Sequence, residues 1–174
     1  MLPENLVFLD EMGVLLGLQR SRGRCRKGQR LYCQKPFYRG QKVTVMGAMT
    51  LKGIIALQTL DRSMNGKDFE PFMQTQVIPQ LWVGAVLVMD NLPAHKVQGI
   101  VEMVEAVGAR VVFLSPYSPD FNPIELLWSQ MKAFLRRFCP KTFDAVTKLL
   151  QLARLLSEQR HFRNWFAHCC HCVQ

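Results

Sequence analysis

Three acidic residues of this chain stand at positions where carboxylates could do chemistry. Asp10 and Asp90 each follow a short apolar run typical of a buried strand, and Glu125 opens a helical pattern after a proline-rich loop. Ligands gather at the carboxyl ends of parallel strands, so we expect the two aspartates to lie side by side and Glu125 to complete the site. Clustered carboxylates repel one another unless a cation compensates. Their hard oxygen atoms suit Mg²⁺ or Mn²⁺, and a pair of such ions promotes phosphoryl transfer.

Each acid also has a purely structural interpretation. Asp10 could simply end its strand, with Glu11 as a competing candidate for function, and Asp90 could belong to a turn. Asn122 stands where the N-cap of a helix is expected, and Glu125, three residues later, would complete a capping box. From the residues alone, both kinds of interpretation stay open.

The charge balance indicates a polyanionic partner. The chain has 174 residues, with 22 Lys and Arg against 13 Asp and Glu, and a formal charge of +9. Hydrophobic residues make up 49% of the chain, which allows a real core. No apolar run approaches the ~20 residues of a membrane span, and residues 1–5 lack the features of a signal peptide. We therefore expect a cytoplasmic protein with no membrane partner.

Much of the positive charge is concentrated between Arg20 and Lys42, a segment that we call the basic arm. No acid occurs between Glu11 and Asp61. Repeated cations among glycines favour a flexible segment that binds phosphates, although a solvated loop is the alternative. The candidate DNA-binding residues of this segment are Arg20, Arg22, Arg24, Arg26, Lys27 and Arg30.

The acids need a scaffold, and the apolar pattern predicts one. Strands are expected at residues 6–9, 43–49, 54–59, 85–89 and 110–114, and helices at residues 67–81, 96–107, 125–138 and 143–157. This order predicts an α/β fold with a mixed five-stranded sheet flanked by helices. We expect a core of residues 1–140 and a C-terminal helical extension, residues 141–174, of the same domain.

Three segments in this order resemble the catalytic core of DDE transposases. They are Phe8–Glu11, Val88–Lys96 and Ser115–Trp128, and the similarity spans about residues 6–137. The nearest pattern is that of the mariner-like superfamily, on its bacterial insertion-sequence side. The 34 residues between Asp90 and Glu125 are a spacing typical of that branch.

The resemblance implies a ribonuclease-H-like fold and an Asp-Asp-Glu triad that maps onto Asp10, Asp90 and Glu125. It implies two Mg²⁺ or Mn²⁺ ions, cleavage of transposon ends, and strand transfer into a target duplex in the nucleoid. It also implies a homodimer in the synaptic complex. Relatives carry N-terminal helix-turn-helix modules, whereas this chain starts nine residues before Asp10. We expect those modules to be encoded separately or to be missing from a fragment.

Other residues are expected to support the site. Lys132 and Arg136 fall on the same helix face as Glu125, where they would contact the DNA backbone. Trp128 is expected to pack in the core rather than against a base. Further supporting candidates are Asn91, His95 and Asn122.

Two other functions are compatible with the residues. A ribonuclease-H-type or structure-selective nuclease would use the same acids without strand transfer. A catalytically silent DNA-binding remnant is the non-enzymatic alternative, and the presence of all three acids argues against it.

Overall fold

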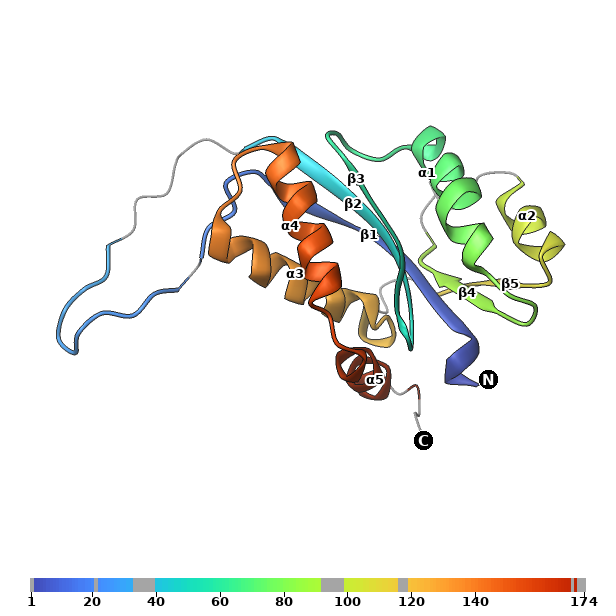
Figure 1. Ribbon diagram of the computed structural model, residues 1–174. Helices are drawn as coiled ribbons and strands as arrows, with labels where there is room; N and C mark the ends of the chain where they lie inside the picture. Colours follow the sequence, from blue (N-terminus) through green and yellow to red (C-terminus); the bar gives the residue numbers. More distant parts are fainter. Residues whose placement is uncertain are drawn as a thin grey trace.

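One mixed sheet of five strands organises the molecule. In the computed structural model, which describes residues 2–20, 22–32, 40–91, 99–115, 119–169 and 171, the strands are β1 (Leu6–Leu15), β2 (Lys42–Thr50), β3 (Gly53–Leu60), β4 (Val86–Met89) and β5 (Arg110–Phe113). They lie in the order β3-β2-β1-β4-β5 (Figure 1). The β1–β2 and β2–β3 pairs are antiparallel, and the β1–β4 and β4–β5 pairs are parallel. The predicted mixed five-stranded sheet is confirmed.

Helices cover both faces of this sheet. They are α1 (Gly66–Phe72), α2 (Ile100–Ala106), α3 (Ile124–Phe138), α4 (Phe143–Leu155) and α5 (Gln159–His168). Helices α3, α4 and α5 pack on one face, and α1 and α2 pack on the other (Figure 1). Short helical turns stand at Pro3–Asn5, Met73–Val77, Ile78–Gln80 and Pro119–Phe121. No helix in the described part of the chain is long and apolar enough to cross a membrane.

Alternation along β1 divides the core into two layers. Phe8 and Met12 belong to the cluster under α3, α4 and α5, whereas Val7 and Leu9 belong to the cluster under α1 and α2. Successive side chains of a strand point to opposite faces of the sheet. Asp10 therefore shares the face of Phe8 and Met12, which is the face that α3 covers.

The prediction that the first strand ends at Leu9 is wrong. Strand β1 continues through Asp10 to Leu15, because β2 pairs with it in antiparallel register from Phe8 to Leu15. Only the parallel pairing with β4 stops at Leu9. Asp10 is thus a mid-strand residue at the point where one of its two neighbouring strands ends.

The helices also differ in detail from the predictions. The helix expected at residues 67–81 is interrupted: α1 ends at Phe72, a wide π turn follows, and Pro79 lies in a closing 3₁₀ turn. Proline cannot donate a backbone hydrogen bond, which explains why regular α structure does not reach residue 81. Helix α5 lies within the helical extension expected at residues 141–174, but its bounds were not predicted, although Phe162 and Phe166 have helical spacing and are both buried. For the helix expected at residues 96–107, residues 96–98 lie outside the described residues.

Candidate active site

The register of β1 and β4 brings two of the three acids side by side. Leu9 and Met89 are the last partners of this parallel ladder, so Asp10 and Asp90 are the next residues along two neighbouring strands. Neighbouring strands lie about 4.8 Å apart. Asp10 is only 7% exposed, and Asp90 is half-buried. The backbone therefore places the two residues side by side at the edge of the sheet where β4 ends.

Glu125 approaches the same region from helix α3. It is the second residue of α3, and its side chain is exposed. Its negative charge lies close enough to Asp10 to raise the pKa of the Asp10 carboxyl. The buried side of α3 packs on the face of β1 that carries Asp10. The helix therefore brings Glu125 toward the region around Asp10 and Asp90, which we call the corner.

Trp128 links α3 directly to Asp10. The indole Nε1–H donates a hydrogen bond to Asp10 Oδ2 over 3.1 Å, and the Trp128 side chain is 1% exposed. The prediction that Trp128 packs in the core is confirmed, but its hydrogen bond to the first acid was not foreseen. Gly47 was also missed: it pairs with Asp10 across β1 and β2, and the indole ring lies over it.

The ionised form of the Asp10 carboxyl is unfavourable in this position when no cation lies beside it. Burial is the main reason why the pKa of Asp10 is raised to about 7, and the charges of Glu11 and Glu125 act in the same direction. Hydrogen bonds from the backbone of Glu11 and from Trp128 lower the pKa and offset part of this effect. A positive charge beside Asp10 would favour its ionised form.

The donor set suits a hard divalent cation. Among the described residues, no three His, Cys, Asp or Glu side chains form a group that could hold a metal ion. The residues that the backbone brings to the corner nevertheless offer only carboxylate oxygen atoms, which Mg²⁺ and Mn²⁺ prefer. A buried carboxyl that is repelled by two negative neighbours is a position where such an ion relieves electrostatic strain.

Asn122 does not play the capping role that its position suggests. Pro123 is the N-cap residue of α3, with φ −64° and ψ −18°, and no side chain caps this helix. The backbone carbonyl of Asn122 accepts a hydrogen bond from the N–H of Glu125. The Asn122 side chain is buried, and its Oδ1 has no hydrogen-bond partner among the residues that the structure describes. The capping-box interpretation of Glu125 is therefore wrong.

Two other supporting candidates follow β4. Asn91 is exposed immediately after Asp90. His95 lies outside the described residues, so its predicted role stays a prediction.

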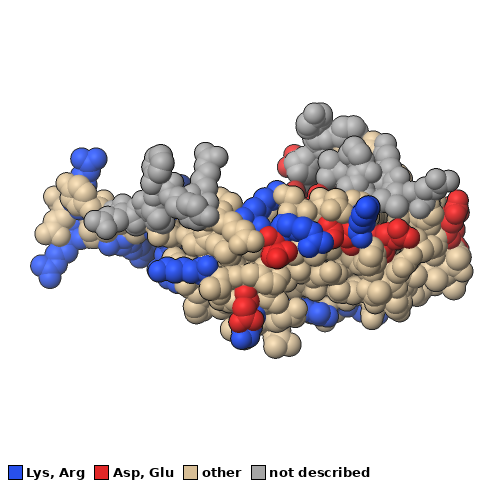
Figure 2. All heavy atoms as spheres, turned by 90° about the horizontal axis from the view of Figure 1, so that it is seen from above, with Lys and Arg blue, Asp and Glu red and all other residues tan. Residues whose placement is uncertain are grey.

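The basic arm leaves the body of the protein between β1 and β2. Residues 22–32 are exposed and have no regular secondary structure, apart from a turn closed by the hydrogen bond from the N–H of Gln29 to the carbonyl of Arg26. Figure 2 shows Lys and Arg side chains along this projecting segment and no Asp or Glu on it. No ion pair neutralises its arginines in the part of the chain that the structure describes. The segment is held at its base, where Leu16 N–H donates to Gln41 O.

The two cations predicted on α3 flank its buried side. Lys132 and Arg136 are half-buried and lie on one line with Glu125, as the helical repeat requires. Along α3, these two cations lie between Glu125 at the start of the helix and the base of the basic arm. The Gly17 N–H donates a hydrogen bond to Pro140 O, which joins the base of the arm to the end of α3.

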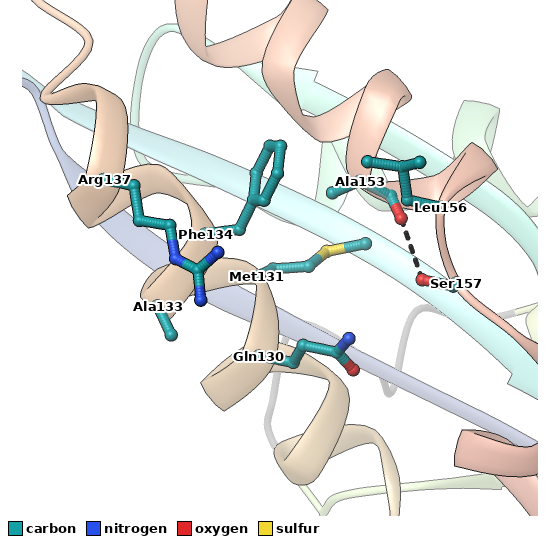
Figure 3. Close-up of a pocket in the computed structure, with 8 residues that line it drawn as sticks. All are labelled: Gln130, Met131, Ala133, Phe134, Arg137, Ala153, Leu156 and Ser157. Atoms are coloured by element: carbon teal, nitrogen blue, oxygen red, sulfur yellow. Dashed lines mark hydrogen bonds between the residues drawn. The ribbon is translucent and has the colours of Figure 1, made fainter.

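A small cavity between α3 and α4 is separate from the acids. Its volume is about 170 Å³, and Figure 3 shows the Arg137 side chain beside Phe134 at its rim. The lining residues are Gln130, Met131, Ala133, Phe134, Arg137, Ala153, Leu156 and Ser157. Since none of them is acidic, this cavity is not the candidate active site.

Comparison with protein families identifies the class of protein that this fold and this corner define. The pattern of the DDE superfamily endonucleases matches residues 5–147, a stretch that holds Asp10, Asp90 and Glu125. The chain belongs to the DDE endonuclease superfamily. The comparison with curated proteins found no match.

Solved structures show the same fold. The structure of the Mos1 strand transfer complex has a TM-score of 0.74 at 16% identity, covering 95% of this chain and 51% of that chain. The Mos1 mariner paired end complex with Mn has a TM-score of 0.69 at 18% identity, covering 94% and 52%. The catalytic domain of Mos1 mariner transposase has a TM-score of 0.66 at 16% identity, covering 94% and 76%. The ribonuclease-H-like fold is therefore confirmed, and the chain spans about half the length of the transposase chains in the two complexes.

Proposed function

We propose that this chain is the catalytic domain of a DNA transposase. It would cut the ends of a mobile element and join them to a target duplex in a cut-and-paste reaction. The observation that carries the proposal is the convergence of Asp10, Asp90 and Glu125 on one corner of the sheet in a DDE endonuclease.

In this proposal the three acids hold two divalent cations. Asp10 is the buried ligand, Asp90 directly follows the neighbouring strand β4, and exposed Glu125 closes the site from α3. Mg²⁺ or Mn²⁺ is inferred from the donor set and from related Mos1 structures that were determined with Mg or with Mn. When bound, the ions would activate the attacking oxygen and stabilise the leaving oxygen of a phosphodiester.

The chain's cations bind the DNA in this proposal. The described residues 22–32 of the basic arm present exposed arginines, without an ion pair among the described residues, that can follow a phosphate backbone. Lys132 and Arg136 extend the positive surface from the arm toward Glu125 along α3. Asn91, His95 and Asn122 are assigned supporting roles beside the acids.

The remaining proposals concern the assembly. The Mos1 relatives were solved in paired-end and strand transfer complexes, from which we infer that this domain works as a homodimer on two transposon ends in the nucleoid. Recognition of the terminal repeats by a helix-turn-helix region, encoded separately, completes the proposal. Residues 141–174 would form a helical extension of the catalytic domain, since α4 and α5 share the core cluster of α3.

The test of the proposed function is the substitution Asp90→Asn. Nicking of supercoiled DNA by the purified chain is measured with Mg²⁺, with Mn²⁺ and with EDTA. We expect cleavage by the wild type only with metal, none by Asp90→Asn, and equal DNA affinity for both. Asp144→Asn is the matched control, because Asp144 is an exposed acid on α4 that forms an ion pair with Lys148. Undiminished cleavage by Asp90→Asn would reject the assignment.

A product assay separates transposition from simple hydrolysis. Labelled DNA ends that carry a free 3′-hydroxyl are incubated with a supercoiled target, and covalent joining of label to target is measured. Joining is the result expected of a transposase. Cutting without joining would instead favour a structure-selective nuclease on the same fold.

A further inference from the structure

The hydrogen bond between Trp128 and Asp10 joins helix α3 to strand β1 at the candidate active site. Indole Nε1–H is only a donor, and here it points at one carboxyl oxygen of Asp10, a residue that is only 7% exposed. A buried carboxylate has two oxygen atoms, so a fixed donor on Oδ2 determines how Oδ1 is presented. The bond therefore sets the orientation of Asp10 rather than merely satisfying a polar group.

Gly47 explains how the indole reaches this position. Gly47 is the Cα partner of Asp10 in the β1–β2 ladder. A Cβ atom at Gly47 would lie 2.5 Å from Trp128 Cη2 and 3.3 Å from Cζ2. Real side chains essentially never approach so closely, and a rigid ring packed against the sheet cannot yield as a flexible chain would. The requirement is steric, because Gly47 is not among the glycines with positive φ.

We propose that Trp128 is a positioning residue that orients Asp10 toward the divalent cation, and that Gly47 supplies the space the indole needs to do so. The inference rests on the proposed function, since it concerns the same site. Metal ligands are commonly oriented by a hydrogen bond from a neighbouring side chain, and loss of such a partner weakens metal binding roughly 10–100-fold. Trp128 and Gly47 act through Asp10 and need not touch the metal or DNA.

Two substitutions remove this orientation by different routes. Trp128→Phe removes the N–H donor and keeps most of the aromatic packing. Gly47→Ala keeps the donor but pushes the ring away from the sheet. The readout is Mn²⁺ affinity of the purified full chain without DNA, measured from the electron paramagnetic resonance signal of free Mn²⁺. We expect the dissociation constant to rise roughly tenfold in each variant.

The chain offers a matched control for each substitution. Trp165→Phe changes another tryptophan on the same sheet face, which packs against Phe162 and forms no hydrogen bond to an acid in the described part of the chain. Gly13→Ala changes another strand glycine of the β1–β2 ladder, where a Cβ would meet only the flexible end of the Lys42 side chain. Both controls should bind Mn²⁺ as the wild type does. Circular dichroism and thermal unfolding check that every variant is folded.

The metal dependence of DNA nicking gives a second readout. If Trp128 orients a ligand, excess Mn²⁺ restores the nicking rate of Trp128→Phe, but it does not restore Asp10→Asn. Wild-type Mn²⁺ affinity in folded Trp128→Phe, with binding lost in Asp10→Asn, would overturn this inference and leave the proposed function intact. Wild-type Mn²⁺ binding in Asp10→Asn would overturn both. If Gly47→Ala fails to fold, Trp128→Phe alone decides.

Discussion

The corner around Asp10 and the basic arm are held by the chain in opposite ways. Asp10 is fixed by ladders to β2 on one side and β4 up to Leu9 on the other, and by the indole of Trp128 from above. Residues 22–32 of the basic arm are exposed, and hydrogen bonds tie the arm to the body only near its base, among the described residues. Asp10 is therefore buried and held on several sides, whereas the described residues 22–32 of the arm are exposed to solvent.

This difference matches the two tasks of the proposed enzyme. Phosphoryl transfer needs oxygen ligands held at set distances, which a sheet interior provides. Binding a phosphate backbone needs positive charge spread over several contacts and tolerates an adaptable segment. Substitutions at the corner should therefore change chemistry, and substitutions in the arm should change affinity.

The largest effect is expected from Glu125→Gln. Loss of one carboxylate from the corner should lower metal-dependent DNA nicking by ~10³-fold or more, because residues that act as a unit fail together. Stability should change little, since the Glu125 side chain is exposed and caps nothing. Glu105→Gln, an exposed acid on α2, is the control. Nicking by Glu125→Gln at the wild-type rate would remove Glu125 from the site.

The next largest effect concerns stability as a function of pH. The folded protein holds a proton on Asp10 up to a pKa of about 7, above the ordinary value of 3.8, so the folded state binds more protons between these values. Stability of the metal-free protein should therefore fall as pH rises from about 4 to about 7, by roughly 3 kcal/mol for this group.

Asp10→Asn should remove that decline and be more stable than the wild type at pH 8 without metal. Urea unfolding at pH 5 and pH 8 in EDTA measures the difference. Addition of Mn²⁺ at pH 8 should stabilise only the wild type. The same pH dependence in both proteins would show that the burial of Asp10 carries no such cost.

A smaller effect, on DNA affinity, is expected from the arm. Replacing Arg22, Arg24 and Arg26 by Ala should weaken binding to duplex DNA at least ~10-fold at low salt, and it should make the salt dependence shallower by about 2.7 in the log–log slope. Thermal stability should stay the same, because these side chains are exposed. Arg163→Ala on α5 is the control, and fluorescence anisotropy across a salt series is the measurement. An unchanged slope would exclude phosphate contacts by the arm.

The smallest effect sharpens the boundary between the two regions. A Cβ at Gly40 would lie 2.2 Å from the backbone oxygen of Leu16 at the base of the arm, so Gly40→Ala should cost about 1 kcal/mol of global stability. Gly28 has φ +85° in the exposed turn, with open space around it. Gly28→Ala should strain only that turn and leave the unfolding midpoint unchanged. Equal losses in both variants would mean that the arm folds together with the core.

Local pattern was sufficient to predict most of the fold. The alternation of apolar residues located all five strands, and the helices at α3 and α4 have nearly their predicted bounds. The extension of β1 to Leu15 was missed, because it depends on pairing with β2, across the whole basic arm. The apolar pattern of residues 6–9 cannot indicate a hydrogen-bond ladder to a strand that is distant in sequence.

The three acids of the candidate site could be predicted from the sequence, but the residues that position them could not. Asp10, Asp90 and Glu125 could be singled out by type and position. The bond from Trp128 to Asp10 spans 118 residues, and the need for Gly47 arises only where a ring from another layer meets the sheet. The expectation that Asn122 caps α3 failed for the same reason, because its buried side chain is placed by tertiary packing rather than by the start of the helix.

The late position of α3 in the chain has a consequence for synthesis. When the ribosome has synthesised all five strands, Asp10 and Asp90 are already present. Glu125 and Trp128, whose indole binds Asp10, have not yet been synthesised. In the proposed enzyme, a chain that ends before α3 would lack Glu125 and Trp128 and should therefore not cleave DNA.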